Sequence, residues 1–346
     1  MTGHEDTGHE DTGLRVVALG GGHGLHATLT ALRRCTPVGE ITAVVTVADD
    51  GGSSGRLRRE LGLLPPGDLR MALSALAADD ADGHFWSGLI QHRFGGTGAL
   101  AGHAVGNLML AGLLERDDDP VRALDALGRL LGCAGRVLPM ARVPLDIEAE
   151  VELDGVSGQH RIRGQVAVAS TPGRVRRVWL RPDEPPACDE AVRAVREADV
   201  VLLGPGSWFT SVLPHLLVPG LRDALLETAA SLVVLLNLEP EPGETAGFSP
   251  EQHLEVLSSH APSLRAHAVL ADSASVPLPD RLQAAAAELL VPGGLLRLAD
   301  VADAGAATPR HDPDALAAAL QDVFGDLTGA VLPSNGPPYG RSPEWP

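Results

Sequence analysis

Apolar runs alternate with helical spacing near the beginning of the chain. Arg15 to Gly22 read RVVALGGG, a short apolar run closed by glycines, and Leu25 to Arg34 carry apolar side chains at helical spacing. Ile41 to Val47 read ITAVVTV, and such β-branched runs are typical of buried strands. A strand, a helix and a second strand in this order predict a βαβ unit and therefore a parallel sheet.

The same rhythm returns further along the chain. Residues 66–131 have mostly helical spacing, whereas residues 136–180 are β-rich and contain Asp154-Gly155, a predicted hairpin turn. Three more strands are predicted at Asp199 to Ser207, Ser231 to Glu239 and Ala266 to Ser273. The pattern predicts an α/β fold with a mainly parallel sheet, into which residues 136–180 insert a small antiparallel β element.

The two ends of the chain lack this pattern. Residues 1–13 contain TGHED twice in tandem, and residues 332–346 are rich in proline and glycine. Neither segment has apolar side chains at a spacing that a core could bury. We therefore expect a disordered tail at 1–13, one α/β domain at 14–331 and a flexible tail at 332–346.

Composition excludes several classes of function. The net charge is −18, which argues against a nucleic-acid or anionic-membrane partner, and all 27 basic residues are arginines. Without lysine there is no Schiff-base chemistry and no Walker-type phosphate loop. No apolar run reaches the roughly 18 residues of a membrane span, and no signal peptide is apparent, so we expect a cytoplasmic protein. Cys35, Cys133 and Cys188 form no CxxC pair and are expected to be buried.

The first candidate site follows the first predicted strand. Gly20, Gly21, Gly22, His23 and Gly24 form a glycine-rich turn before a helix, where free N–H groups favour an anion such as phosphate. Its register also satisfies GxGxxA, which is typical of a dinucleotide-binding protein. A tight turn without a ligand is the alternative interpretation.

The second candidate site is ADDGGSSGR, directly after ITAVVTV. It offers two carboxylates suited to ribose or a metal ion, several amides and hydroxyls suited to an anion, and one arginine that could neutralise phosphate. This combination favours a nucleotide or sugar-nucleotide pocket, although the arginine alone could be an exposed loop residue. The candidate residues are Asp49, Asp50, Gly51, Gly52, Ser53, Ser54 and Arg56.

Two polar pairs lie in the helical region. PPGDLR places Asp68 near a helix start and Arg70 in its first turn, so Asp68 either caps the helix or faces the ligand. GHAVGN places His103 and Asn107 four residues apart, which puts them on one face of a helix. That pair is either a hydrogen-bonded core pair or a wall of the pocket.

Two later loops complete the predicted rim. GPGS is a second anion-receptive turn after a buried strand, and NLEPEPGET follows the next strand. Loops that follow parallel strands converge on one edge of the sheet, so all these segments are expected to surround one site. The candidate residues are Gly204, Pro205, Gly206, Ser207, Asn237, Gly243, Glu244 and Thr245.

These motifs together resemble a known family. GGGHGL, ITAVVTVADDGGSSGRLR, PPGDLR, GHAVGN, ADVVLLGPGSWFTSVLPHLLV and PGET occur in this order between about Arg15 and Leu298. They closely resemble the YvcK-type gluconeogenesis factors, which are kin to the 2-phospho-L-lactate transferases (CofD) of coenzyme F420 synthesis. PPGDLR and the continuous VTVADDGGSSGRLR resemble the YvcK branch rather than CofD.

The resemblance implies a fold, a ligand and a role. It implies a Rossmann-like three-layer fold in a cytoplasmic protein that binds UDP-sugars such as UDP-N-acetylglucosamine and regulates cell shape and peptidoglycan synthesis during gluconeogenic growth. Proteins of cell-wall synthesis are then expected partners. CofD instead transfers a phospholactyl-type group from a guanylylated donor to a deazaflavin alcohol with Mg²⁺, and Asp49 and Asp50 match the acidic pair expected to hold acceptor or metal.

The chain departs from the family pattern at two loops. His23 replaces the usual threonine of GGGTG, and NLEPEPGET places Glu239 and Glu241 near the pocket rim, where anions oppose a diphosphate unless a cation intervenes. The leading hypothesis is a nucleotide-sugar-binding regulator without turnover of its own. A Mg²⁺-dependent transferase and an NAD oxidoreductase are the alternatives. The sheet and its insertion each offer a surface for a homodimer.

Overall fold

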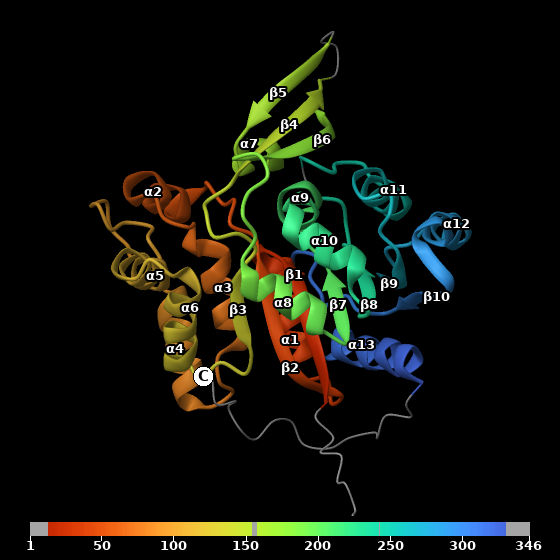
Figure 1. Cartoon of the computed structure of the whole chain (residues 1–346), viewed down its shortest axis with the longest axis horizontal. Coiled ribbons are helices and arrows are strands. Elements are labelled where there is room, and N and C mark those ends of the chain that lie inside the picture. Colours follow the sequence, from red (N-terminus) through yellow and green to blue (C-terminus); the bar gives the residue numbers. More distant parts are fainter. Residues whose placement is uncertain (1–12, 154–157, 242, 330–346) are drawn as a thin grey trace, which may run out of the picture.

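A seven-stranded parallel sheet forms the centre of the molecule (Figure 1). The computed structural model describes residues 13–153, 158–241 and 243–329. The strand order across the sheet is β10-β9-β8-β7-β1-β2-β3. The strands are β1 (Leu14–Gly20), β2 (Val38–Val45), β3 (Arg136–Pro139), β7 (Val200–Leu203), β8 (Ser231–Leu235), β9 (Ala266–Asp272) and β10 (Leu290–Ala299).

The connectivity is that of a Rossmann-like fold. From β1 the chain moves outward through β2 to β3, then returns to the other side of β1 and builds β7, β8, β9 and β10 in turn. Val16 of β1 therefore pairs with Ile41 of β2 on one side and with Val200 of β7 on the other. The predicted α/β fold with a mainly parallel sheet is confirmed, and the direction of strand addition reverses between β1 and β7.

Helices cover both faces of the sheet and give a three-layer arrangement. Figure 1 shows α8 and α10 in front of the sheet and α1 behind it, where α1 packs against α3 and α13. Both faces of the central strands are thus buried, which explains their continuous apolar runs. The helices are α1 (Gly22–Leu32), α2 (Gly52–Leu61), α3 (Pro66–Leu76), α4 (Ala81–Gln91), α5 (Val105–Arg116), α6 (Pro120–Leu130), α7 (Gln165–Ala169), α8 (Asp189–Glu197), the π-helix η1 (Trp208–Val212), α9 (Pro214–Leu217), α10 (Pro219–Glu227), α11 (Pro250–His260), α12 (Pro279–Leu289) and α13 (Pro313–Thr328).

A small antiparallel sheet is inserted between the two halves of the fold. It consists of β4 (Asp146–Glu152), β5 (Gln159–Arg163) and β6 (Arg174–Arg181) in the order β5-β4-β6, with α7 between β5 and β6. The β-rich stretch predicted from residue 136 begins with β3, which pairs with β2 in the main sheet, so the antiparallel part starts at Asp146.

The structure differs from the sequence-based predictions at two places, and other predictions concern residues outside the described ranges. β10 was not predicted, because Pro292 and two glycines interrupt its apolar pattern, and its pairing with β9 shifts register there. Arg56 belongs to the helix α2 and not to an exposed loop. Residues 1–12 of the tail predicted at 1–13, the tail predicted at 332–346 and the Asp154-Gly155 turn lie outside the described residues.

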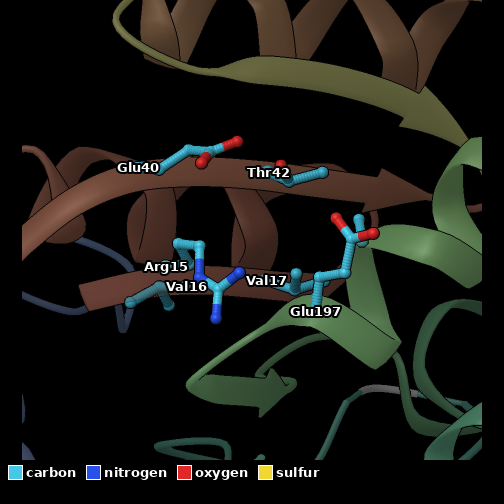
Figure 2. A pocket seen from close by; sticks show the side chains of 7 residues that line it. Arg15, Val16, Val17, Glu40, Thr42 and Glu197 are labelled. Atoms are coloured by element: carbon cyan, nitrogen blue, oxygen red, sulfur yellow. The ribbon is translucent and has the colours of Figure 1, made fainter. Parts of the chain in front are cut away.

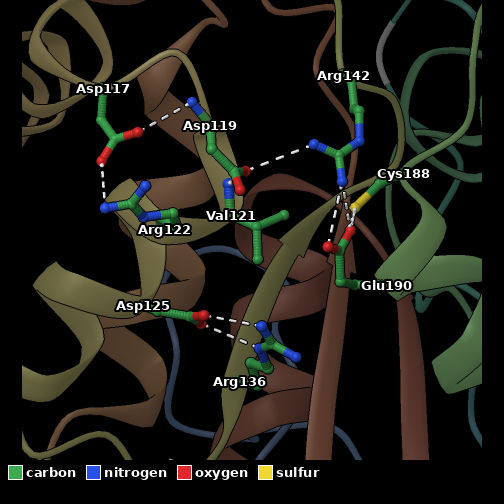
Figure 3. A network of polar contacts seen from close by, with 9 residues as sticks. All are labelled: Asp117, Asp119, Val121, Arg122, Asp125, Arg136, Arg142, Cys188 and Glu190. Carbon is green, nitrogen blue, oxygen red and sulfur yellow. Dashed lines mark hydrogen bonds and ion pairs between the residues drawn. The ribbon is translucent and has the colours of Figure 1, made fainter. Parts of the chain in front are cut away.

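An ionic network joins the elements on either side of β3 (Figure 3). Arg142 bonds Glu190 of α8 at 2.8 Å and reaches Asp119 at the start of α6 at 3.5 Å. Arg136 of β3 holds Asp125 of α6 through two hydrogen bonds of 3.0 and 2.8 Å. The network fixes the point where the chain leaves the first half of the fold.

The three cysteines are buried, as their isolation in the sequence predicts. Burial raises the pKa of each thiol to about 12, so all three stay protonated at neutral pH. Protonated thiols are poor nucleophiles and poor metal ligands. Within the described chain, no helix has the length and apolar character needed to cross a membrane.

Candidate functional site

Two glycine turns meet where the strand order reverses. The turn after β1 leads into α1 through Gly20, Gly21 and Gly22, and the turn after β7 runs through Gly204 to Ser207 before η1. The backbones touch: a Cβ on Gly24 would lie 2.2 Å from the carbonyl oxygen of Pro205. Ligands of open α/β sheets bind at such a reversal point, outside the carboxyl ends of the strands.

A pocket of about 350 Å³ opens at this point. The first turn and α1 contribute one wall, the β7 turn contributes a second, and the loop after β8 contributes a third. The fourth wall is the segment from Thr308 to His311, directly before α13, and it was not predicted from the sequence. The lining residues are His23, Gly24, Ala27, Pro205, Gly206, Asn237, Leu238, Glu239, Pro240, Glu241, Thr308, Pro309, Arg310 and His311.

The charged side chains of this pocket are mostly acidic. Glu239 and Glu241 line it, and burial raises the pKa of Glu241, an effect that nearby His23 partly offsets. Arg310 is already paired, because it donates two hydrogen bonds of 2.8 and 2.7 Å to Asp303. Burial lowers the pKa of His311 to about 4, so it is neutral. This environment suits hydroxyl and N–H donors better than phosphate oxygens.

Asp68 lies in the first turn of α3, but its side chain reaches the amino end of α1 instead of capping its own helix. Its Oδ2 would be 2.9 Å from a Cβ placed on Gly21, and α3 has no side-chain cap. Burial, and next the charge of Asp49, raise the pKa of Asp68 to about 7, although the N–H of Gly22 and the charge of Arg70 oppose this. The capping alternative for Asp68 is therefore wrong, and the residue faces the predicted anion turn.

Asp49 and Asp50 turn in different directions. Asp49 Oδ1 accepts a hydrogen bond from the N–H of Gly51 (2.9 Å), and burial raises its pKa. Asp50 Oδ1 accepts one from the N–H of Val166 (2.9 Å), the second residue of α7 in the inserted sheet. Asp50 thus joins the strand-end loop to the insertion. Its charge also raises the pKa of Asp49, and the charge of Asp49 in turn raises the pKa of Asp68.

Asp49 and Asp68 lie around the same turn, because Asp49 Oδ2 would be 2.5 Å from a Cβ placed on Gly67, directly before Asp68. Mg²⁺ typically takes one or two protein carboxylates and completes its shell with water and phosphate oxygens. A nearby cation would lower both pKa values and so offset the effect of burial. Three or more acidic, histidine or cysteine side chains arranged for a metal do not occur in the described part of the chain. The predicted metal role of Asp49 and Asp50 stays a prediction.

The remaining residues of ADDGGSSGR hold neighbouring segments. Ser53 Oγ contacts His103 Nδ1 (2.9 Å) and accepts a hydrogen bond from Asn107 Nδ2 (2.9 Å), so the predicted polar pair meets at a buried serine. His103 precedes α5 instead of lying on it. Ser54 Oγ accepts a hydrogen bond from the N–H of Gly67 (2.6 Å), directly before Asp68. These contacts connect α2 with α3 and α5.

Two buried residues of the loop after β8, Glu244 and Thr245, support the β7 turn through hydrogen bonds to the backbone. Glu244 is 1% exposed, and its Oε1 accepts a hydrogen bond from the N–H of Phe209 (3.1 Å) at the start of η1. Thr245 is fully buried, and its hydroxyl accepts a hydrogen bond from the N–H of Glu241 (2.8 Å). A Cβ on Gly243 would meet the carbonyl of Ala169 at 2.1 Å, so α7 packs closely on this loop.

Fourteen of the predicted residues fall into two groups. Those at the pocket and at the amino end of α1 are Gly21, Gly22, His23, Gly24, Asp68, Pro205, Gly206 and Asn237. Ser53, Ser54, His103, Asn107, Glu244 and Thr245 instead hold the surrounding segments through the contacts above. The pocket residues Thr308 to His311 lie in a short stretch, TPRH, which matches no phosphate or metal motif and so gave no signal.

Comparison with known proteins identifies the family. The family described as 2-phospho-L-lactate transferase CofD matches residues 16–291. A protein of Mycobacterium tuberculosis (strain CDC 1551 / Oshkosh) named "Putative gluconeogenesis factor" is 56% identical over 335 residues, which are 96% of this chain and 95% of the relative. The protein named "Gluconeogenesis factor" of Bacillus subtilis (strain 168) is 37% identical over 263 residues, 76% of this chain and 80% of the relative.

Solved structures agree with the sequence relatives. The crystal structure of a UPF0052 family member from Bacillus halodurans superposes with a TM-score of 0.76 at 34% identity, covering 89% of this chain and 99% of that one. The two proteins therefore share their overall fold. The chain belongs to the CofD family and, within it, to the proteins named gluconeogenesis factor.

Proposed function

We propose that this chain binds a nucleotide sugar of the UDP-N-acetylglucosamine type and acts as a cytoplasmic regulator of cell shape and peptidoglycan synthesis during gluconeogenic growth. The observation that carries the proposal is the pocket between the two glycine turns, at the reversal of strand order between β1 and β7. Its volume of about 350 Å³ is within the range of small-molecule sites. The family relationship supports a nucleotide-type ligand.

The charges suggest how the parts of such a ligand would be distributed. The carboxylates of Glu239 and Glu241 would accept hydrogen bonds from ribose hydroxyls and base N–H groups in the pocket. The diphosphate would lie at the amino end of α1, where the backbone N–H groups and the helix dipole favour negative charge. Asp68 occupies the edge of that position, so a Mg²⁺ held by Asp49 and Asp68 would neutralise both partners.

Isothermal titration with UDP-N-acetylglucosamine, with and without Mg²⁺, tests this proposal. Ala27→Leu places a larger side chain in the pocket wall while keeping good helix propensity, so we expect it to abolish binding. Ala284→Leu, on the exposed face of α12, is the matched control and should bind as the wild type does. Absence of saturable binding by the wild type to any UDP-sugar would sink the proposal.

The second candidate is a CofD-like transferase of phosphorus-containing groups, and the carboxylate pair Asp49 and Asp68 favours it. Such a pair could hold Mg²⁺ on a diphosphate donor. An acceptor hydroxyl would lose its proton and attack the distal phosphorus, the P–O–P bond would break, and a nucleoside monophosphate would leave. Transfers of this type depend mainly on positioning and charge neutralisation. A donor-consumption assay separates the two candidates. Consumption that requires Mg²⁺ would favour the transferase, and binding without consumption would favour the regulator.

A further inference from the structure

Arg70 is a buried cation whose hydrogen-bonding capacity is unused. The residue is 4% exposed, and its Nε is buried without a hydrogen-bond partner. Within residues 13–153, 158–241 and 243–329, no hydrogen bond or ion pair joins its guanidinium group to another residue. Burying an unpaired charge costs several kcal/mol, so a fold that keeps one has a use for it.

The packing around Arg70 holds the side chain in place. A Cβ on Gly106 of α5 would lie 2.9 Å from Arg70 Cγ, so α5 approaches the stem of the side chain at a glycine. The charges of Asp68 and Asp49 act on the guanidinium group, but neither carboxylate is within ion-pair distance. Burial lowers the pKa of Arg70 to about 10, which still leaves it fully charged at neutral pH.

A second arginine lies near the same start of α5, because the backbone of Arg93 pairs in an isolated bridge with Ala104, two residues before Gly106. Arg93 is exposed, and its positive charge lowers the pKa of Arg70 further. One of its N–H groups, on Nη1, donates to the carbonyl of Gly102 (2.9 Å), next to Ala101, whose carbonyl accepts a hydrogen bond from Arg56 Nη2 (2.7 Å). Two neighbouring guanidinium groups repel each other, and an anion that binds both would stabilise them.

The place of this cluster along the sheet edge is informative. The pocket lies at the ends of β1, β7 and β8, the amino end of α1 comes next, and Asp49 follows the neighbouring strand β2. Arg70 lies beyond Asp68 on α3, which packs against β2 and β3. A ligand with its nucleoside in the pocket and its diphosphate at α1 would therefore direct its other end toward Arg70 and Arg93.

We propose that Arg70 and Arg93 form a second anion subsite, which receives a carboxylate or phosphate at the end of the ligand away from the nucleoside. This inference rests on the proposed nucleotide-sugar function and names a substrate class for it: nucleotide sugars that carry an additional negative charge. A guanidinium fork can bind two oxygens of a carboxylate or of a phosphate at once, and neutral sugars carry neither group.

The test compares two sugar nucleotides by isothermal titration: UDP-glucuronic acid, which has a carboxylate, and UDP-N-acetylglucosamine, which has none. We expect the wild type to prefer UDP-glucuronic acid by about tenfold, the size of one hydrogen bond to a charged group. Arg93→Gln and Arg70→Gln should each abolish this preference. Arg93 is exposed, so its variant is expected to fold even where Arg70→Gln does not. Arg222→Gln, an exposed arginine of α10, removes the same charge and should leave the preference unchanged.

Orthophosphate, followed by phosphorus NMR line broadening, tests the subsite without a nucleotide. Saturable broadening that Arg93→Gln weakens would identify phosphate as the anion, even if no UDP-sugar bound and the proposed function failed. A carboxylate preference without phosphate binding would identify the carboxylate. The subsite is refuted if neither UDP-glucuronic acid preference nor phosphate binding depends on Arg70 or Arg93.

Discussion

The side chain of Asn237 closes the glycine turn after β7 by bonding both backbone groups of Gly206. Its Oδ1 accepts a hydrogen bond from the N–H of Gly206 (2.8 Å), and its Nδ2 donates one to the carbonyl of the same residue (2.9 Å). Gly206 has φ +138°, a conformation that other residues rarely adopt. The end of β8 thereby fixes the shape of the turn at β7, so both walls of the pocket are set together.

Asn237→Asp should weaken both the fold and the site. Aspartate keeps an acceptor for the N–H of Gly206 but replaces the donor by a carboxylate oxygen that faces the Gly206 carbonyl. We expect a loss of about 1–3 kcal/mol in the free energy of unfolding, measured in urea, and a clear loss of UDP-N-acetylglucosamine affinity. Gln321→Glu is the control, because it makes the same amide-to-acid change at a solvent-exposed hydrogen bond, whose partner is the rotatable hydroxyl of Thr36. Unchanged binding in Asn237→Asp would show that the β7 turn does not form the pocket.

Gly24→Ala tests the contact between the two glycine turns. The added methyl group would lie 2.2 Å from the carbonyl oxygen of Pro205, so one turn must move, at a cost of about 1–3 kcal/mol. Gly112→Ala in α5 is the control, because nothing lies within 4 Å of its added methyl group. Alanine there should stabilise the protein by about 0.5–1 kcal/mol. Thermal unfolding of both variants measures the contrast, and equal midpoints would contradict this view of the turns.

A second, much smaller cavity shows why position matters more than shape. It has a volume of about 40 Å³ and lies between the amino-terminal parts of β1 and β2, beside Arg15, Glu40 and Glu197 (Figure 2). Arg15 there already bonds Asp199 through its side chain. This edge of a parallel sheet presents strand starts instead of the strand-end loops that bind ligands. The proposed ligand is therefore expected at the strand-end edge of the sheet and not in this cavity.

Sequence periodicity predicts most of the sheet because its strands are buried on both faces. Continuous apolar runs such as Ile41 to Val47 have few interpretations other than a central strand. β10 escaped prediction because Val291-Pro292-Gly293 resembles a turn, and its place beside β9 depends on tertiary pairing. The loops at the strand ends could also be predicted, because each directly follows a predicted strand and parallel strands end at one edge of the sheet.

The roles of individual polar residues were less predictable, because they depend on contacts between distant segments. Asp68 was expected either to cap α3 or to face the ligand, and only the fold brings it to the amino end of α1. Asp50 is paired with Asp49 in the sequence but with Val166 in space, 116 residues away. Arg310 reaches the pocket because α13 packs against α1, a contact that no local pattern encodes.

Asp68→Asn and Asp50→Asn should separate the two candidate metal pairs. If Asp49 and Asp68 hold the ion, Asp68→Asn abolishes the Mg²⁺ enhancement of UDP-sugar binding, whereas Asp50→Asn retains it and its Oδ1 can still accept from Val166. Because burial raises the pKa of Asp68 to about 7, Mg²⁺ must compete with a proton below that pH. Titrations at several pH values should therefore show Mg²⁺ affinity rising between about pH 6 and 8. Loss of the enhancement in Asp50→Asn alone would restore the pair predicted from the sequence.

Glu244→Gln should change how stability depends on pH. Burial raises the pKa of Glu244 from 4.5 to about 7, so the folded protein keeps this proton over a range in which the unfolded chain has lost it. Glu244 therefore makes the wild type progressively less stable as pH rises from about 4.5 to about 7, by about 3 kcal/mol in total. Glutamine cannot ionise, and its Oε1 can still accept from the N–H of Phe209.

Urea unfolding of Glu244→Gln and the wild type from pH 4.5 to 8.5 measures this difference. The two proteins should be about equally stable near pH 4.5, and the variant should gain on the wild type until about pH 8. Other buried carboxyls such as Asp68 act in both proteins alike, so the difference curve isolates Glu244. The exposed Glu255→Gln is the control and should run parallel to the wild type. A Glu244→Gln curve that also runs parallel would mean that the carboxyl group behind η1 does not titrate in this range.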